Sequence, residues 1–182
     1  MKKHTFLNTI ISIIIGIVLA LIVKKYILLI GYIPSSSMED TLKVGDFIIA
    51  NRLAYIFTEP QRGDIICFNH LKYIETKNNI ENLEQYTSDI YIKRVIGLPG
   101  EHIEINENQI IIDGIIYNED YIKDYNWGNG NYIFDVPENS FLLLGDNRNA
   151  SYDARYWDNS YVNKEDIVAK YLYTIKHIDK VE

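Results

Sequence analysis

The first clear pattern in the chain is an uninterrupted apolar run near its N-terminus. From Phe6 to Val23 the sequence reads FLNTIISIIIGIVLALIV, which contains no charged residue and is dominated by Ile, Leu and Val. A helix of this length rises about 27 Å, close to the roughly 30 Å hydrocarbon core of a bilayer. The apolar pattern resumes as YILLIGYI after Lys24 and Lys25, whose long stems can cover apolar surface while their charges reach the interface. The pattern predicts a transmembrane anchor over residues 6–30, preceded by a short N-terminal segment, residues 1–5.

Two other interpretations of this run need to be weighed. A cleavable signal peptide has a shorter apolar region with small residues at its cleavage site, whereas this run is followed by KKYILL. A helix in the core of a soluble domain would be unusual without a charge anywhere on its circumference. The membrane anchor is therefore the preferred interpretation.

Beyond the anchor, apolar residues occur in short β-type runs separated by turn residues. Asp113-Gly114, between two apolar runs, is the strongest hairpin signal in the chain. Many short strands with little helical periodicity predict a mainly β fold, an antiparallel barrel-like or sandwiched β domain over residues 31–182. Two polar stretches, residues 72–89 and 118–135, fit this core poorly and are predicted to be surface insertions. The predicted strands lie in DFIIANRLAYI, GDIICFNH, DIYIKRVIGLPG, HIEI, QIIIDGIIYN, SFLLLGDNR and DIVAKYLYTI.

Charge is distributed unevenly between the anchor and the β domain. Residues 1–30 carry four lysines and no acid, whereas the other 14 basic residues and all 25 acidic residues lie beyond residue 30, which gives −11 there. Lys2 and Lys3 favour a cytoplasmic N-terminus and a β domain outside the plasma membrane, although Lys24 and Lys25 act against this orientation. An acidic domain without a basic tract argues against nucleic acid as a partner.

Cysteine and histidine give no sign of a metal or cofactor. Cys67 is the only cysteine, so no disulfide can form within the chain and no C-x-x-C pair exists. The four histidines are scattered without the spacing of metal ligands. No metal and no cofactor are therefore expected. The histidines are His4, His70, His102 and His177.

Candidate chemistry begins with three hydroxyls that follow the apolar run, in PSSSMEDTL at residues 34–42. Serines after a proline are common in loops, so this segment alone decides nothing. A serine nucleophile needs a base, and burial in an apolar strand can lower the pKa of a lysine enough for that role. Lys93 lies in such a strand, and Lys93 and Arg94 point to opposite faces of it. The alternative is a lysine on an edge strand that discourages pairing with other chains.

A third feature is the charged segment GDNRNASYDARYWD, residues 145–158. It follows an apolar strand and alternates acids with arginines. Such spacing allows bidentate ion pairs that hold loops rigidly, and a solvated charged loop is the alternative. The residues concerned are Asp146, Arg148, Asp153 and Arg155.

Taken in order behind an N-terminal membrane segment, IPSSSMEDTL, GDFIIANR, IKRVIGLPG and GDNRNASYDARYW resemble the sequence motifs of bacterial type I signal peptidases, peptidase family S26. The resemblance covers most of residues 33–172. It implies a membrane-anchored serine endopeptidase with a Ser-Lys dyad on a β-rich fold. Such an enzyme removes N-terminal signal peptides, with small residues before the cut, from exported preproteins. It works at the surface of the lipid bilayer, close to the secretion translocon.

The resemblance also implies roles for single residues. Ser37, which precedes a methionine, corresponds to the nucleophile, and Lys93 corresponds to the general base. Ser35 corresponds to the hydroxyl that forms the oxyanion hole with the Ser37 backbone N–H. Ser151 matches a serine that hydrogen-bonds to the lysine and orients it. The supporting residues are Asp153 and Arg155, as an ion pair, with Asp146 and Arg148 in the preceding turn.

The sequence departs from the family pattern at a few positions of these motifs. Asp40 stands where proline is common, Asn149-Ala150 replaces a frequent Asp-Asn, and Ala154 stands where serine is often found. These departures leave both dyad residues in place, so they bear on loop rigidity and substrate preference.

Two other classes of protein are alternatives. A self-cleaving Ser-Lys regulator would need a DNA-binding segment and a self-cleavage site in place of the anchor, and neither is visible. A non-enzymatic envelope protein would leave the serine segment and the lysine in an apolar strand without a purpose. The peptidase is therefore the favoured function.

Overall fold

The computed structural model describes residues 2–39, 41–74, 85–106, 109–122 and 130–176. Asp40, His177 and the central parts of the two predicted insertions, residues 75–84 and 123–129, lie outside the described residues.

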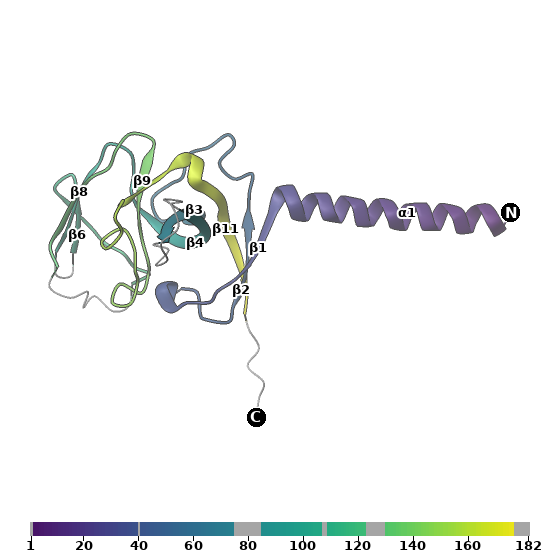
Figure 1. Cartoon of the computed structure of the whole chain (residues 1–182), viewed down its shortest axis with the longest axis horizontal. Helices are drawn as coiled ribbons and strands as arrows, with labels where there is room; N and C mark the ends of the chain where they lie inside the picture. Colours follow the sequence, from purple (N-terminus) through teal and green to yellow (C-terminus); the bar gives the residue numbers. More distant parts are fainter. Residues whose placement is uncertain (1, 40, 75–84, 107–108, 123–129, 177–182) are drawn as a thin grey trace, which may run out of the picture.

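The apolar run at the N-terminus forms helix α1 (Lys2–Ile22), which continues as a π-helical turn, η1 (Val23–Ile27). Phe6–Ile27 is long and apolar enough to cross a membrane, and the rest of the chain buries none of it. Figure 1 shows α1 extending away from the β domain, on the side where β1 (Leu28–Tyr32) lies. The helical part of the predicted anchor, residues 6–30, ends at Ile27, because residues 28–30 belong to this strand. Periodicity alone does not separate a buried strand from a continuing helix in an apolar run.

The β domain consists of two antiparallel sheets. Among the described residues, the large sheet has seven strands in the order β1-β2-β11-β3-β4-β9-β10, and the small sheet has four in the order β7-β6-β5-β8. The small sheet lies at the end of the domain remote from α1 (Figure 1). The remaining strands are β2 (Phe47–Asn51), β3 (Ile65–Ile74), β4 (Gln85–Gly97), β5 (His102–Asn106), β6 (Gln109–Ile112), β7 (Ile115–Tyr117), β8 (Tyr132–Asp135), β9 (Ser140–Leu144), β10 (Tyr161–Asn163) and β11 (Ile167–Ile175).

Two apolar clusters stabilise this arrangement. The larger cluster joins the two sheets, with Phe68 of β3 and Leu142 of β9 packed in one core with Ile103 of β5. The second cluster gathers residues of β1, β2, β3 and β11 around Met38 and Leu42, both of which are fully buried. The segment that follows β1 is therefore fixed by two apolar side chains in the core, and this segment contains the three serines.

The predicted fold class is confirmed as mainly antiparallel β sheets with one N-terminal apolar helix. The predicted hairpin is also confirmed, because Ile112 pairs with Ile115 across a turn in which Asp113 and Gly114 have φ of 49° and 78°. Positive φ at both turn residues matches the twist of the flanking strands.

The sequence did not predict β8 and β10 or the full length of the hairpin formed by β3 and β4. The described ends of the predicted insertion at 72–89 belong to β3 and β4, and the end of the one at 118–135 forms β8, which pairs with β5. Short strands on the outside of a sheet have too few apolar residues to give a clear alternation.

Candidate active site

The serine segment forms a short 3-10 turn, Ser36–Met38, directly after an extended Ser35. Asn147 holds this turn through two hydrogen bonds. Its backbone N–H donates to the Ser37 carbonyl at 3.1 Å, and its side-chain amide donates to the Ser36 carbonyl at 3.0 Å. With Met38 buried in the core, the turn is held at several points. Ser37 is thereby presented half-buried in a defined position.

Lys93 contacts Ser37 from an interior strand of the large sheet. It lies on β4, which pairs with β3 on one side and β9 on the other, so it is not on an edge strand. Its Nζ lies 2.8 Å from Ser37 Oγ and 3.1 Å from the Ile92 carbonyl oxygen. The side chains of Ser37 and Lys93, 56 residues apart in the sequence, are in direct contact.

The environment of Lys93 favours its neutral form. The residue is only 4% exposed, and this burial lowers its pKa from about 10.5 to about 8. The negative charges of Asp153 and Asp146 act in the opposite direction but are outweighed. Loss of hydration destabilises the ammonium form. The two carboxylates stabilise this form by a smaller amount, because each is already paired with an arginine. A lysine with this pKa is partly unprotonated near neutral pH and can accept a proton.

The other two predicted serines also lie beside Ser37. Ser35 Oγ is 3.4 Å from Ser37 Oγ, and either hydroxyl can be the donor. Ser151 is buried, and its Oγ has no hydrogen-bond partner among the described residues. The expected hydrogen bond from Ser151 to Lys93 is therefore not formed in this structure, because Lys93 Nζ is turned toward Ser37 Oγ and the Ile92 carbonyl.

Gly145 lets these groups approach one another. A Cβ atom at this position would lie 2.1 Å from Ser151 Oγ and 2.4 Å from the Ser37 carbonyl oxygen. Real Cβ atoms do not come this close to backbone oxygen, so any side chain here would push the turn away from the serine segment. The absence of a side chain at Gly145 is what allows the segment after β9 to pack directly on Ser37.

The charged segment after β9 forms ion pairs, both within itself and with distant residues. Asp153 and Arg155 pair with each other through Arg155 Nε and Asp153 Oδ1 at 2.8 Å. Asp146 pairs with Arg94 of β4, at 2.8 Å and 2.6 Å. All four residues are buried, so the alternative of a solvated charged loop is wrong.

Arg148 pairs with an acid outside its own segment. Its guanidinium makes two bonds, 2.5 Å and 2.6 Å long, to Glu119, which belongs to the stretch predicted as a surface insertion. Glu119 is 2% exposed. The sequence offered no signal for this contact, because Glu119 stands in a polar stretch and 29 residues separate it from its partner.

Two described histidines of the β domain have contacts of their own. His102 is on the small sheet, where its hydrogen bond to Asp135 raises its pKa, and His70 packs against Tyr91 and Trp157. Among the residues that the structure describes, no group of three or more His, Cys, Asp or Glu could hold a metal ion. The contact between the Ser37 hydroxyl and the Lys93 amine allows nucleophilic attack by a hydroxyl with an amine as the proton acceptor.

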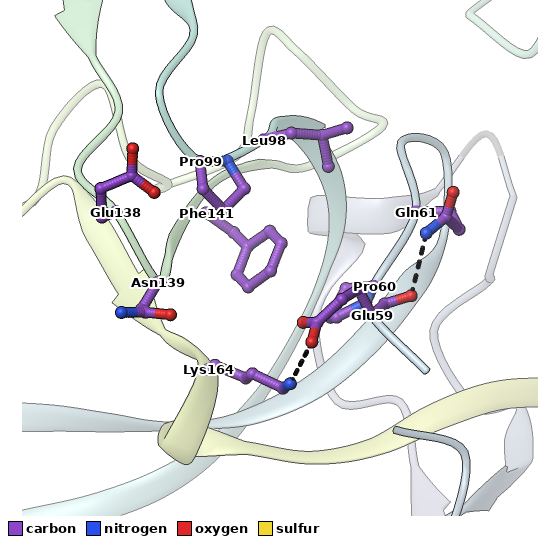
Figure 2. A pocket seen from close by; sticks show the side chains of 9 residues that line it. All are labelled: Glu59, Pro60, Gln61, Leu98, Pro99, Glu138, Asn139, Phe141 and Lys164. Carbon is purple, nitrogen blue, oxygen red and sulfur yellow. Dashed lines mark hydrogen bonds and ion pairs between the residues drawn. The ribbon is translucent and has the colours of Figure 1, made fainter. Parts of the chain in front are cut away.

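A separate open pocket of about 290 Å³ lies on another part of the domain. Figure 2 shows Phe141 at its floor and the ion pair between Lys164 and Glu59 at its rim. Neither Ser37 nor Lys93 lines it, and its lining contains no serine, cysteine or histidine. The pocket therefore adds nothing to the site at Ser37.

The chain is similar in sequence to known proteins of one family. The family model described as "Signal peptidase, peptidase S26" matches residues 6–175. Signal peptidase I of Leptolyngbya laminosa is 40% identical over 159 residues, which cover 86% of this chain and 72% of that protein. Signal peptidase IB of Staphylococcus aureus is 30% identical over 188 residues, which cover 93% and 88%. A crystal structure of a signal peptidase I from Enterococcus faecalis is 29% identical, covers 62% of this chain and 96% of that chain, and gives a TM-score of 0.46.

An apolar N-terminal helix joined to antiparallel sheets, with a serine hydroxyl against a buried lysine, places the molecule among the membrane-anchored serine peptidases. The family match covers nearly the whole chain, anchor included. The chain belongs to the signal peptidases of peptidase family S26, of the signal peptidase I type, which remove signal peptides from preproteins.

Proposed function

We propose that Ser37 is the nucleophile and Lys93 the general base of this peptidase. The observation that carries the proposal is the 2.8 Å contact between Lys93 Nζ and Ser37 Oγ, made by a buried lysine whose pKa is about 8. Neutral Lys93 takes the hydroxyl proton as Ser37 Oγ attacks the carbonyl carbon of the scissile peptide bond. The resulting ammonium then donates this proton to the leaving amine, and an acyl-enzyme on Ser37 remains.

Water then hydrolyses the acyl-enzyme in a second half-reaction. Lys93, neutral again, accepts a proton from a water molecule that attacks the acyl carbonyl. Ser37 Oγ is the leaving group, and it recovers its proton from the Lys93 ammonium. One lysine thus acts as base and then as acid in both half-reactions, which is possible because its pKa is close to the working pH.

The oxyanion formed in each half-reaction needs hydrogen-bond donors. Ser37 stands in the first turn of a 3-10 helix, where a backbone N–H has no acceptor within the helix, and the Ser35 hydroxyl lies beside Ser37 Oγ. These two donors form the proposed oxyanion hole, and removal of one such donor typically costs about 2.7–4 kcal/mol of transition-state stabilisation. Ser151 contributes a buried hydroxyl next to the serine segment. This hydroxyl can accept a hydrogen bond from the Lys93 ammonium after Lys93 has taken the proton of Ser37.

The paired charges after β9 support the site without touching substrate. Asp153 with Arg155, and Asp146 with Arg94, keep the segment that carries Ser151 in place. The same segment contains Arg148, which is bonded to the Gly145 carbonyl. The proposed substrate is a preprotein with small side chains before the cut.

The test compares Ser37→Ala with Ser36→Ala, a matched removal of the neighbouring hydroxyl. Each full-length variant is solubilised in detergent and incubated with a secretory precursor, and the mature product is followed on a gel. Ser37→Ala should form no product although its thermal unfolding matches that of the wild type, whereas Ser36→Ala should retain activity. Normal turnover by Ser37→Ala would remove this serine as nucleophile and direct attention to Ser35.

We further propose that residues 1–5 lie in the cytoplasm and residues 31–182 outside the plasma membrane, near the secretion translocon. Lys2 and Lys3 support this orientation, as does the location at which a signal peptide's cleavage site emerges. Protease added to intact protoplasts should digest the β domain. Full protection of the domain, with lysed protoplasts as the positive control, would show the reverse orientation.

A further inference from the structure

Glu119 is a buried carboxylate outside all four sequence motifs of the site. It lies between β7 and β8, and only 2% of its surface is exposed. Burial of a charge is costly unless the charge is paired and hydrogen-bonded. Glu119 meets this requirement through both oxygens, which accept from Arg148 at 2.5 Å and 2.6 Å.

Arg148 is part of the turn that is hydrogen-bonded to Ser37. Arg148 Nε donates to the Gly145 carbonyl at 3.0 Å, which closes the turn 145–148. Asn147, inside this turn, donates to the Ser37 carbonyl at 3.1 Å and to the Ser36 carbonyl at 3.0 Å. The charge of Glu119 therefore stabilises the turn that positions the serine segment.

A second contact joins the same stretch to the strand that carries Lys93. The Tyr121 hydroxyl donates to Glu119, and the Tyr121 ring lies 3.8 Å from the guanidinium carbon of Arg94. Arg94 follows Lys93 on β4 and pairs with Asp146 of the turn. Residues 119–121 thus contact both Arg148, in the turn, and Arg94, next to Lys93 on β4.

We propose that Glu119 is a positioning residue for the reaction: through Arg148 it holds the turn 145–148 against the serine segment and so keeps Ser37 Oγ within reach of Lys93. The proposal rests on the proposed function of Ser37 and Lys93. Misplacement of a reacting group by about 1 Å can reduce the rate roughly 100-fold. Loss of the Glu119 charge should therefore act on kcat more than on KM.

The test is Glu119→Gln, which keeps the size of the side chain and removes its charge. The control is Glu101→Gln, because Glu101 forms a partly buried ion pair with Arg62, and the bonds of this pair do not lead to the turn 145–148 or to the serine segment. Both full-length variants are assayed in detergent with the same precursor, each well below its own unfolding temperature. Glu119→Gln should lower kcat by about 10- to 100-fold with KM within about threefold of wild type, whereas Glu101→Gln should keep the wild-type kcat.

Tyr121→Phe provides a milder second variant in case Glu119→Gln does not fold. It removes the hydroxyl bonded to Glu119 and keeps the ring against Arg94, so we expect a loss in kcat of about threefold to tenfold. An unchanged kcat in folded Glu119→Gln or, if that variant does not fold, in Tyr121→Phe would overturn the proposal. An equal loss in Glu101→Gln would also overturn it. Ser37→Ala, run in parallel, separates this failure from failure of the proposed function, because its inactivity does not depend on Glu119.

Discussion

Replacing Lys93 by methionine should abolish activity and, at neutral pH, stabilise the fold. The pKa of Lys93 falls from about 10.5 in the unfolded chain to about 8 in the folded one. As pH rises, the folded chain gives up this proton first, so between these two values the unfolded chain holds one proton more and stability increases with pH. A difference of about 2.5 pKa units corresponds to about 3 kcal/mol, which is the cost of the buried ammonium below pH 8.

Methionine has a similar length and carries no charge, so Lys93→Met removes this cost. The gain should be about 3 kcal/mol at pH 7 and less than about 1 kcal/mol at pH 10, where the wild-type lysine is neutral when folded and about one quarter neutral when unfolded. The hydrogen bonds that the variant loses to Ser37 and to the Ile92 carbonyl lower its stability at every pH. The prediction therefore concerns the change in the gap between the two proteins, about 2–3 kcal/mol.

The assay is thermal unfolding of the full-length proteins in detergent at pH 7 and at pH 10. With about 2–4 °C per kcal/mol for a chain of this size, the difference in Tm should shrink by roughly 5–10 °C between the two pH values. Lys43→Met, which removes an exposed lysine, is the control, and its Tm difference from wild type should not change with pH. A gap for Lys93→Met that is equal at pH 7 and pH 10 would refute the lowered pKa, and with it the argument that burial makes this lysine a base.

Three further predictions follow from the same contacts. The kcat/KM of the wild type should rise about tenfold per pH unit below pH 8 and level off above it, while Lys93→Arg, whose guanidinium stays protonated, should be nearly inactive throughout a pH–rate profile. Asp146→Asn leaves the buried guanidinium on β4 without its charged partner and should cost about 3–5 kcal/mol, seen as a lower Tm in detergent; a Tm within about 2 °C of wild type would contradict this. Gly145→Ala places a methyl group 2.1 Å from Ser151 Oγ, so kcat on a precursor should fall strongly, and unchanged turnover would mean that the turn can move without effect.

The sequence predicted those parts of the site that lie in local patterns. The strand around Lys93, the hairpin at Asp113-Gly114 and the ion pair between Asp153 and Arg155 each depend on residues close together in the chain. Such features leave a signature in apolar periodicity or in the spacing of charges. The motif resemblance then brought the serine and lysine together, which periodicity could not do.

What the sequence could not predict depends on pairing between distant segments. Lys93 and Arg94 lie on opposite faces of β4, so alternation suggests that only one of them is buried. Both are buried, because β4 lies between β3 and β9 and other segments cover both faces of the strand. The partner of Asp146 is 52 residues away, and Arg148 pairs with Glu119 in a stretch that composition assigns to the surface. Each of these contacts is fixed by the topology of the sheet and has no local signal.

The chain passes directly from the apolar helix into the large sheet, which fixes the distance between the helix and the site. Strand β1 begins immediately after the π-helical turn, and each of its residues pairs with β2, from Leu28 opposite Asn51 to Tyr32 opposite Phe47. The link between the helix and the serine segment is therefore rigid, because a paired strand of five residues has a fixed length of roughly 17 Å. The hydroxyl of Ser37 is therefore held at a fixed distance from the end of the apolar helix. Under the proposed function, this distance selects a peptide bond by its position along the precursor, in addition to the side chains beside it.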